Sequence, residues 1–241
     1  QNINILNKGN VLEASGEVEI KTDNNIEIFS DNSKVDKEKS YLEASGNVRA
    51  IDVNKKLEIE SDKIVYDKKI ELLKTFGESK IFYDNDIILK SKNLKFERNK
   101  NILSSDFKTS LEDNLGNILN FEKFTYDTLE GIIEVINLNF KDVENNNFRL
   151  AEATVNINTK EIVGKDAKLY FSKSTFGNSE NDPRIFGNSL IRNENSTTLT
   201  KAIFTSCKFR EKERCPPWIL KADEVKHDKK KKSIEYKNAW L

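Results

Sequence analysis

The chain has 241 residues, of which 37% are hydrophobic and 33% are charged, and its 40 acidic side chains balance its 40 basic ones. A net charge of zero provides no field that would recruit nucleic acid or an anionic surface. No apolar run approaches the roughly 20 residues of a membrane-spanning helix, and no secretory leader opens the sequence. Because the chain contains no Met, we expect a processed protein or an excised piece.

Two seven-residue stretches of the N-terminal region nearly repeat each other. Residues 12–18 read LEASGEV and residues 42–48 read LEASGNV, thirty positions later. The same interval then reaches four more apolar residues that open strand-like runs: Leu72, Ile102, Ile132 and Ile162. Self-similarity at 20 to 50 residues is typical of stacked repeats. The sequence therefore predicts one hairpin-sized unit, two extended arms joined by a polar turn, used six times.

Apolar and polar residues alternate along these runs. In the first repeat the apolar face comprises Leu12, Ala14, Gly16, Val18 and Ile20. Strict alternation predicts strands with one apolar face, and Asn-, Asp- and Lys-rich turns separate them. Since a sheet with one apolar face must curl or meet a second sheet, the predicted fold class is all-β: stacked antiparallel strands in a sandwich, jelly roll or flattened solenoid. Gly16, Gly46 and Gly77 occupy matching places, which predicts bulges or a close backbone approach there.

The rhythm of the repeat divides the chain into three segments. Residues 11–171 carry the repeats, and residues 172–203, rich in Ser, Asn and Gly, are predicted to form an irregular insertion. Residues 204–241 restore a pair of arms, out of phase with the earlier ones. Because the chain stops directly after a strand, at Trp240 and Leu241, we expect a boundary before another domain.

A specific resemblance rests on two patterns. An A-D-x-V-x-x-D arm, a polar turn and an L-x-A-x-G-x-V arm resemble the OstA-type repeat of bacterial lipopolysaccharide (LPS) transport proteins. In addition, FTSC at 204–207, Trp218 after two prolines and VKHD at 225–228 resemble the periplasmic domain of LPS-assembly proteins, the LptD family. The repeat covers residues 11–171, and the C-terminal stretch 204–241 distinguishes between branches of the family.

The resemblance implies a fold, a cargo and partners. It implies an OstA/LptA-like β-jelly roll whose interior carries the acyl chains of LPS, at the periplasmic face of the bacterial outer membrane. It also implies an LptA-like periplasmic bridge protein joined by edge-strand addition, and an outer-membrane barrel with its plug lipoprotein, expected downstream of this chain. The predicted function is LPS transport and outer-membrane assembly. The alternatives are a soluble LptA-like bridging protein and a purely structural β-solenoid.

Alternate residues of the predicted strands would form the wall of a lipid groove or of a core, because every second side chain points inward. The alternative is a packed core that touches no lipid. The candidate wall residues are Val18, Ile20, Ile28, Val48, Ile59, Phe82, Leu89, Phe107, Leu111, Phe121, Leu138, Phe140, Leu150, Leu169 and Phe171.

The two cysteines, Cys207 and Cys215, do not make a disulfide scaffold in so long a chain. The resemblance implies that Cys207 pairs with a cysteine of the barrel. A local Cys207–Cys215 bridge, closing a short polar loop, is the pairing we favour within this chain, and an independent Cys215 thiol is the alternative.

The residues that carry enzyme chemistry are sparse. His227 is the one histidine, between Lys226 and Asp228 on a predicted strand, and we interpret it as a hairpin residue. The sequence has no Gly-rich phosphate loop and no Cys/His spacing of a metal site. The lysine run 229–232 is predicted as a solvated turn, with a contact to lipid phosphates as the alternative. We therefore predict no enzyme activity, no metal site and no cofactor.

Overall fold

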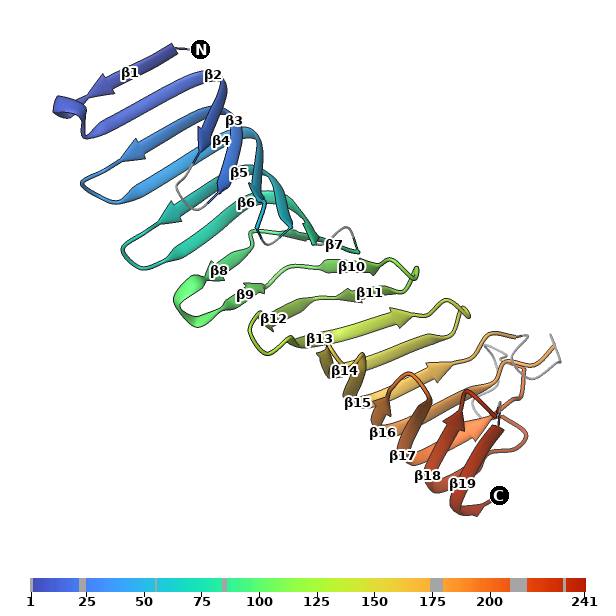
Figure 1. Ribbon diagram of the computed structural model, residues 1–241. Helices are drawn as coiled ribbons and strands as arrows, with labels where there is room; N and C mark the ends of the chain where they lie inside the picture. Colours follow the sequence, from blue (N-terminus) through green and yellow to red (C-terminus); the bar gives the residue numbers. More distant parts are fainter. Residues whose placement is uncertain are drawn as a thin grey trace. The chain divides into compact units, whose positions relative to one another are not determined.

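The computed structural model describes most of the chain and shows a protein built almost entirely of β-strands (Figure 1). The described residues are 2–21, 25–54, 56–83, 86–173, 180–208, 216–231 and 233–241. The chain forms two compact units, which we call unit 1 and unit 2. Unit 1 comprises residues 1–114 and 123–129, and unit 2 comprises residues 115–122 and 130–241. The all-β prediction is confirmed.

Unit 1 contains eleven strands and two short 3₁₀ helices among its described residues. The strands are β1 (Asn2–Leu6), β2 (Val11–Lys21), β3 (Ile26–Asp36), β4 (Tyr41–Asp52), β5 (Leu57–Asp67), β6 (Leu72–Tyr83), β7 (Ile87–Lys92), β8 (Lys95–Glu97), β9 (Ile102–Ser105), β10 (Thr109–Asp113) and β12 (Lys123–Asp127). The helices are η1 (Asn7–Gly9) and η2 (Arg98–Lys100). The pairings β1–β2, β2–β3, β3–β4, β4–β5 and β5–β6 are all antiparallel.

Unit 2 contains eight strands among its described residues. They are β11 (Ile118–Phe121), β13 (Ile132–Lys141), β14 (Asn147–Asn156), β15 (Glu161–Tyr170), β16 (Arg184–Arg192), β17 (Ser196–Thr205), β18 (Leu220–Asp228) and β19 (Ser233–Trp240). From β13 onward each strand pairs antiparallel with the next, and β11 pairs with β13.

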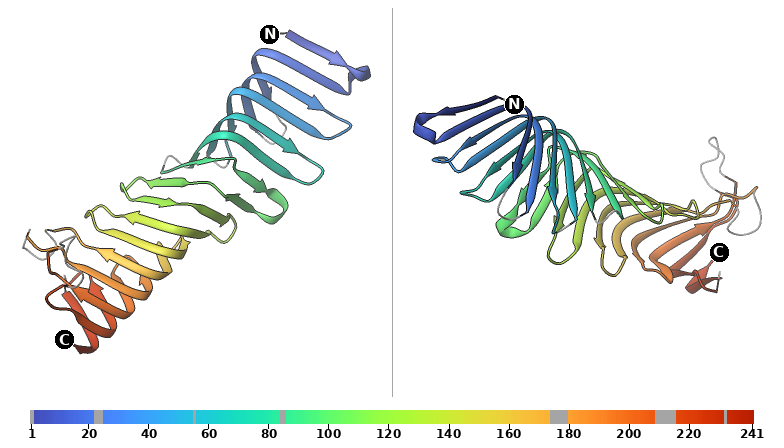
Figure 2. Two further views of the ribbon diagram at one scale, coloured as in Figure 1. Left: turned by 180° about the vertical axis from the view of Figure 1, so that it is seen from behind. Right: turned by 45° about the horizontal axis from the view of Figure 1, so that its top comes forward.

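The long strands of unit 1 bend in the middle, so that each contributes to two arms (Figures 1 and 2). The register of β2 against β3 shifts between Ser15 and Val18, and that of β4 against β5 shifts between Ser45 and Val48. Gly46 lies in the second gap with φ of 78°, a left-handed conformation that glycine adopts without steric cost. The predicted bulges at the repeated glycines are therefore confirmed, and they form the corner between the arms.

The corners of unit 2 lack these glycines and use polar residues instead. Asn137, Lys201 and Asn238 adopt left-handed φ angles of 55°, 48° and 51°. Each is held by a side chain of a neighbouring strand or its edge. Asn137 Nδ2 donates to Glu122 Oε2 at 2.7 Å, Lys201 Nζ to Asp223 Oδ1 at 2.8 Å, and Asn238 Nδ2 to Asp223 Oδ2 at 3.0 Å. These bonds compensate the strain that such φ angles impose on a residue with a Cβ.

In each unit the two arms enclose an apolar interior. In unit 1 one cluster joins Ala44 and Ile64 of one arm to Ile28, Val48 and Ala50 of the other. In unit 2 the large apolar side chains with at most 1% exposure are Leu138, Leu169, Ile185, Leu190, Leu199 and Val225. Each unit is thus a roll of bent antiparallel strands, as the repeat predicted.

One predicted segment boundary is wrong. Residues 172–203 were predicted to form an irregular insertion, but β16 and most of β17 lie within them. Their alternation is hard to see in the sequence, because odd-numbered residues face inward before the corner and even-numbered residues after it. The inner-facing residues are first Ile185 and Gly187, and then Leu190 and Arg192. The remaining part of that segment, 174–179, lies outside the described residues.

Candidate functional site

The candidate site is the apolar interior between the two arms of each unit. In both units the backbone register lines up inner-facing residues of successive strands in rows that cross the sheet. The row nearest the free end of an arm, here called the lip row, decides whether the interior is open. In unit 1 the arm that carries the lip row ends at the turns 37–40, 68–71 and 98–101. In unit 2 the corresponding arm ends at the turns 157–160 and 193–195.

The lip row of unit 1 is apolar and partly exposed. Its members pair from strand to strand, and all have intermediate burial: Leu12, Val35, Leu42, Tyr66, Leu73, Phe96, Leu103 and Tyr126. The row begins on β1, where Ile5 pairs with Leu12 and is 67% exposed. Ile3, opposite Ala14, is 65% exposed. The interior of unit 1 therefore reaches solvent along this lip and at β1.

The inner corner of unit 1 is lined by small hydroxyl side chains. Ser61 Oγ lies 3.2 Å from Ser79 Oγ, and Ser79 Oγ donates to Thr75 Oγ1 at 2.6 Å. One strand further, the Ser91 and Thr109 hydroxyls lie 2.7 Å apart. Because these groups satisfy one another, they are buried without the penalty of unpaired polar atoms. The corner is thus partly polar, while the arms are apolar.

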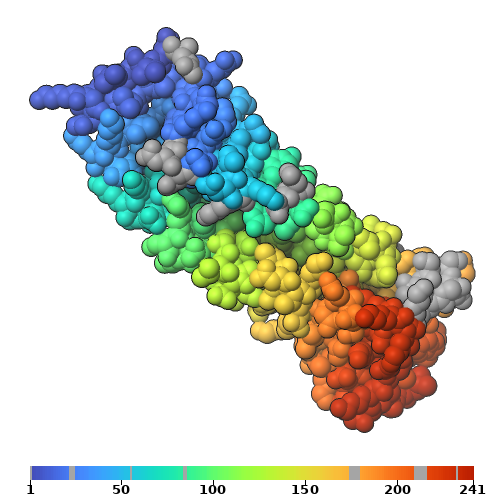
Figure 3. Space-filling view, viewed as in Figure 1, coloured from blue at the N-terminus to red at the C-terminus, as the bar shows by residue number. Residues whose placement is uncertain are grey.

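The lip row of unit 2 occupies the same place in the roll but is buried. It comprises Ile133, Val155, Ile162, Arg192, Thr197, His227 and, on the edge strand β19, the half-buried Ile234, paired in that order. Thr197 is fully buried, and the Arg192 side chain is only 13% exposed. The space-filling view shows the face of β16 to β19 that it presents, orange to red, as a closely packed surface (Figure 3).

The burial of this row results from contacts between the two arms of unit 2. Arg192 lies over the rings of Phe140 and Phe148, 4.9 and 4.3 Å from their centroids, and its Nη2 is 3.1 Å from Asp142 Oδ2. These partners belong to the opposite arm, near the β13–β14 turn. His227 meets Phe171 edge to face at 5.3 Å. The stacked and ion-paired guanidinium of Arg192 is favourable when little water competes.

The carboxylate of Asp142 is held independently of Arg192. Its Oδ1 accepts hydrogen bonds from the backbone N–H groups of Glu144 and Asn146, at 3.1 and 2.9 Å. Its Oδ2 accepts a third from Asn146 Nδ2 at 3.1 Å. Asp142 therefore organises its own turn and presents one remaining lone pair to Arg192.

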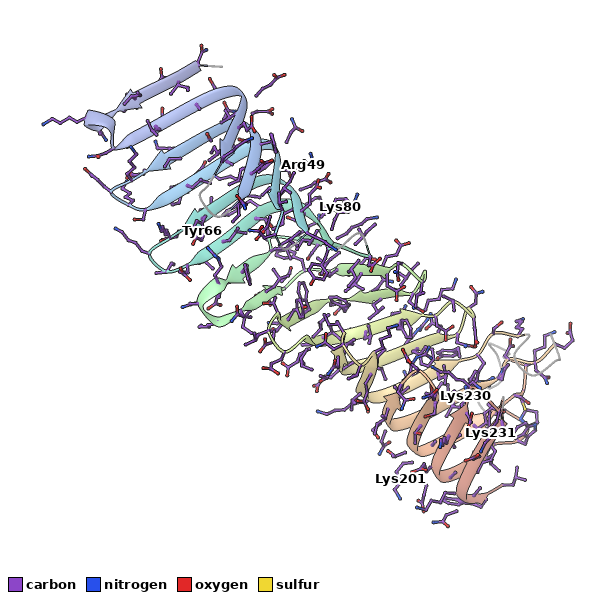
Figure 4. All side chains as sticks on the ribbon, viewed as in Figure 1. Arg49, Tyr66, Lys80, Lys201, Lys230 and Lys231 are labelled. Atoms are coloured by element: carbon purple, nitrogen blue, oxygen red, sulfur yellow. The ribbon has the colours of Figure 1, made fainter. Side chains whose placement is uncertain are left out.

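Charges gather around this contact. Burial lowers the pKa of Lys229 to about 8, and the positive charge of Arg192 acts in the same direction. Burial likewise lowers the pKa of His227 and of the Arg192 guanidinium. Lys229 Nζ donates to the backbone carbonyl oxygen of Asn193 at 2.7 Å. The lysine run 229–232 was predicted as a solvated turn, and this is wrong for Lys229, whereas Lys230 and Lys231 are exposed (Figure 4) and Lys232 lies outside the described residues.

The sequence-predicted wall residues lie almost entirely on the inner faces. Eleven of them are buried to less than 9% exposure: Val18, Ile28, Val48, Leu89, Leu111, Phe121, Leu138, Phe140, Leu150, Leu169 and Phe171. Ile20 and Ile59 are partly buried and pack against the cluster of unit 1. Contact with lipid stays a prediction for all of them.

Two of the predicted wall residues are not on an inner face. Phe107 is 43% exposed, because it falls at the corner between β9 and β10, thirty residues after Gly77. Phe82 lies on the outer face of β6, where Lys80 Nζ is 4.2 Å from its ring centroid. The inward position beside it belongs to Ile81, which is 7% exposed. The bulge in β6 shifts the register, so that counting every second residue along the strand assigns Phe82 to the wrong face.

The outer faces carry ion pairs beside exposed apolar residues such as Val163 and Ile191. Arg49, Glu60 and Lys80 are neighbours across β4, β5 and β6, and Figure 4 shows Arg49 and Lys80 on the same arm of unit 1. A hollow of about 320 Å³ on the N-terminal strands is also polar, with Glu13, Lys34 and Glu43 in its wall. It does not suit an acyl chain.

Cys207 is half-buried, with Sγ 3.9 Å from the Trp218 carbonyl oxygen. Cys215 lies outside the described residues, so the Cys207–Cys215 bridge stays a prediction. Within the described part of the chain, no group of three or more His, Cys, Asp or Glu side chains has an arrangement that would hold a metal ion. No helix in that same part has the length and hydropathy to cross a membrane.

No family model matches the chain, and no curated protein matches it. Among solved structures it is similar to LptH, the LptA homologous periplasmic component of the lipopolysaccharide transport device from Pseudomonas aeruginosa. The identity is 16% and the TM-score 0.37, over 43% of this chain and 76% of LptH.

Proposed function

We propose that this protein carries the acyl chains of LPS through the periplasm, inside the roll formed by its bent strands. The observation that carries the proposal is the partly exposed lip row of unit 1, which gives an apolar interior access from solvent. Moving an acyl chain through water exposes apolar surface at roughly 25 cal/mol per Å², so a continuous apolar wall lowers the barrier to transport. The protein needs no chemistry of its own for this task.

Within that role, the LptD-like arrangement is our preferred one. The FTSC element, Trp218 and the VKHD sequence support it, because they resemble the periplasmic domain that precedes an outer-membrane barrel. LPS would then be delivered to the barrel and its plug lipoprotein. A soluble LptA-like bridge fits the roll equally well and differs in lacking a following barrel, so the sequence of the complete gene separates the two.

The strand edges of the units suit an LptA-like partner. In unit 1, β1 pairs only with the Val11–Ser15 half of β2, and the Val18–Lys21 half is paired with β3 alone among the described strands. At the other end of the strand order, β19 pairs with β18, and Tyr236 and Trp240 remain exposed. Edges with free backbone donors and acceptors accept further strands.

The test is photo-crosslinking of LPS to matched neighbours on opposite faces. A photoreactive residue at Ile20 or Leu73 faces the interior, and one at Glu19 or Lys74 faces outward on the same strand. We expect lipid adducts at the two inner positions and none above background at the outer ones. Equal labelling of both faces, or none at the inner positions of a folded sample, would refute the proposal.

One observation favours the second candidate function, a purely structural β-stack. The interior of unit 2 is filled by its own side chains, as expected of a closed core. A structural stack would leave Ile20 and Leu73 unlabelled, so the same experiment distinguishes the two candidates.

A further inference from the structure

We infer that Arg192 is a latch that holds the two arms of unit 2 closed, and that it must release Asp142 before an acyl chain can enter this unit. The inference rests on the proposed function for the identity of the cargo, but the latch itself is a property of the fold. Its first basis is position. Arg192 ends β16 on one arm, whereas Phe140, Phe148 and Asp142 lie at the free end of the other.

The register shows how far apart these groups would be in a flat sheet. Phe148 pairs with Leu169, which pairs with Ile185, seven residues before Arg192 on β16. At about 3.3 Å per residue, the Arg192 end of β16 would lie roughly 23 Å along the strand from Ile185. Arg192 contacts Phe148 only because the arms fold onto each other. The contact therefore spans the opening of the roll.

The second basis is the filling of the interior. Leu169, Ile185, Leu190, Leu199 and Val225 have at most 1% exposure, so no acyl chain fits between them while the arms are in contact. Entry requires the arms to separate, and the contacts that must break are those across the lips. They are the Arg192–Asp142 ion pair, the stacking of Arg192 on two Phe rings, and the His227–Phe171 contact.

The third basis is the chemistry of an arginine in an apolar row. Its neighbours in the lip row include Ile162 and Thr197, which carry no charge. A guanidinium instead forms a contact that is strong while water is excluded and weak once water enters, because water competes for both the carboxylate and the ring faces. This is the behaviour that a reversible closure needs.

The latch can be tested without harming the turn that Asp142 organises. Arg192→Met keeps the length and apolar stem of the side chain, and Asp142 retains its three hydrogen bonds from Glu144 and Asn146. Lys165→Met is the matched control. It removes the cation of an exposed ion pair, Lys165–Glu152, from the outer face of the same unit.

The separation of the arms is read by spin labels on the two lips. In a Cys207→Ser, Cys215→Ser background, nitroxides replace the exposed Val143 and Asn195, which lie on the turns of opposite arms. With Arg192 present we expect one narrow distance distribution. Arg192→Met is expected to add a longer, broader population, and Lys165→Met is not. An unchanged distribution in Arg192→Met overturns the latch.

The link to lipid entry is read by a photoreactive residue at Leu190, inside unit 2, with added LPS. Arg192→Met is expected to raise the yield of adducts there several-fold, without changing the yield at Leu73 in unit 1. Separation of the labels without adducts at either position would keep the latch and refute the acyl-chain cargo. Adducts at Leu73 with none at Leu190 in the opened variant would confine the cargo to unit 1 and overturn the entry step.

A second experiment does not depend on how Arg192→Met folds. A bis-maleimide, chosen to match the measured label distance, joins cysteines at Val143 and Asn195 in the protein that retains Arg192. We expect this lock to abolish adducts at Leu190 and to leave those at Leu73 unchanged. Adducts at Leu190 that persist in the locked protein would overturn the inference.

Discussion

Units 1 and 2 place the same row of the repeat in different environments. In unit 1 the lip row consists of apolar and aromatic residues that are partly exposed, from Leu12 to Tyr126. In unit 2 the corresponding row is buried and contains Arg192, Thr197 and His227. The difference teaches that one repeat geometry leaves its lip row partly exposed in one unit and buries most of it in the other, where the row contains polar as well as apolar residues.

The largest expected difference concerns apolar truncation. Leu199→Ala removes a side chain with no exposure in unit 2, and we expect it to lower the free energy of unfolding by about 2–5 kcal/mol. Leu42→Ala removes a partly exposed side chain in unit 1, and we expect less than about 2 kcal/mol. Urea unfolding measures both. Trp218 and Trp240, both in unit 2, report Leu199→Ala by fluorescence, and circular dichroism reports Leu42→Ala. Equal losses would contradict the partial exposure of the lip row in unit 1.

The next largest effect concerns how closely the interior of unit 2 is packed. A Cβ on Gly164 would lie 2.7 Å from Leu150 Cδ1 and 2.8 Å from the Glu152 carbonyl oxygen. Because the backbone oxygen cannot move aside, we expect Gly164→Ala to destabilise the unit by about 1–3 kcal/mol in urea unfolding. Its control is Val163→Ala, at the exposed neighbouring position, with an expected change below about 1 kcal/mol. A harmless Gly164→Ala would mean that the interior of unit 2 is loose.

Much of the fold, and part of the site, followed from the sequence. The thirty-residue interval and the strict alternation around Gly46 identified the strands and their inner faces, because a period of two is visible wherever a strand is straight. Phe82 and Phe107 were misplaced because a bulge or a corner changes which parity faces inward. Arg192 falls thirty residues after Ile162, but it was missed because it is charged and because its strand changes parity between Gly187 and Leu190. Contacts across the roll, such as Arg192 with Asp142, leave no periodic signal.

The pH dependence of unit 2 should come from its one histidine. Burial lowers the pKa of His227 below its ordinary 6.5, so the unfolded chain binds a proton more readily than the folded one. Stability is therefore highest above pH 6.5 and falls as the pH drops through that value toward the folded pKa. The lowered pKa of Lys229 affects stability in a separate pH range, between its folded pKa of about 8 and its ordinary pKa of 10.5.

The measurement is tryptophan-monitored urea unfolding between pH 5 and 7.5, in the protein and in His227→Gln. We expect the slope in this range to shrink in the variant. A slope of equal size in both proteins would show that the carboxylates, and not His227, set the acid sensitivity of the unit.

The smallest expected effect is that of an outer-face ion pair. Lys165→Met breaks the pair with Glu152, in which both side chains are more than 60% exposed. Exposed pairs contribute little, so we expect a change within about 0.5 kcal/mol in the free energy of unfolding. A loss that rivals that of Gly164→Ala would mean that outer-face charges, rather than the interior, hold the roll together.

The most direct test of the central claim is photo-crosslinking of LPS at three positions in one set of proteins: Leu73 inside unit 1, Leu190 inside unit 2, and Lys74 on the outer face. The partly exposed lip row of unit 1 and the buried one of unit 2 together predict strong labelling at Leu73, weak labelling at Leu190 that rises in Arg192→Met, and background at Lys74. Labelling of Lys74 equal to that of Leu73, or no labelling at Leu73 in a folded protein, would contradict the claim that the interior of this roll carries lipid.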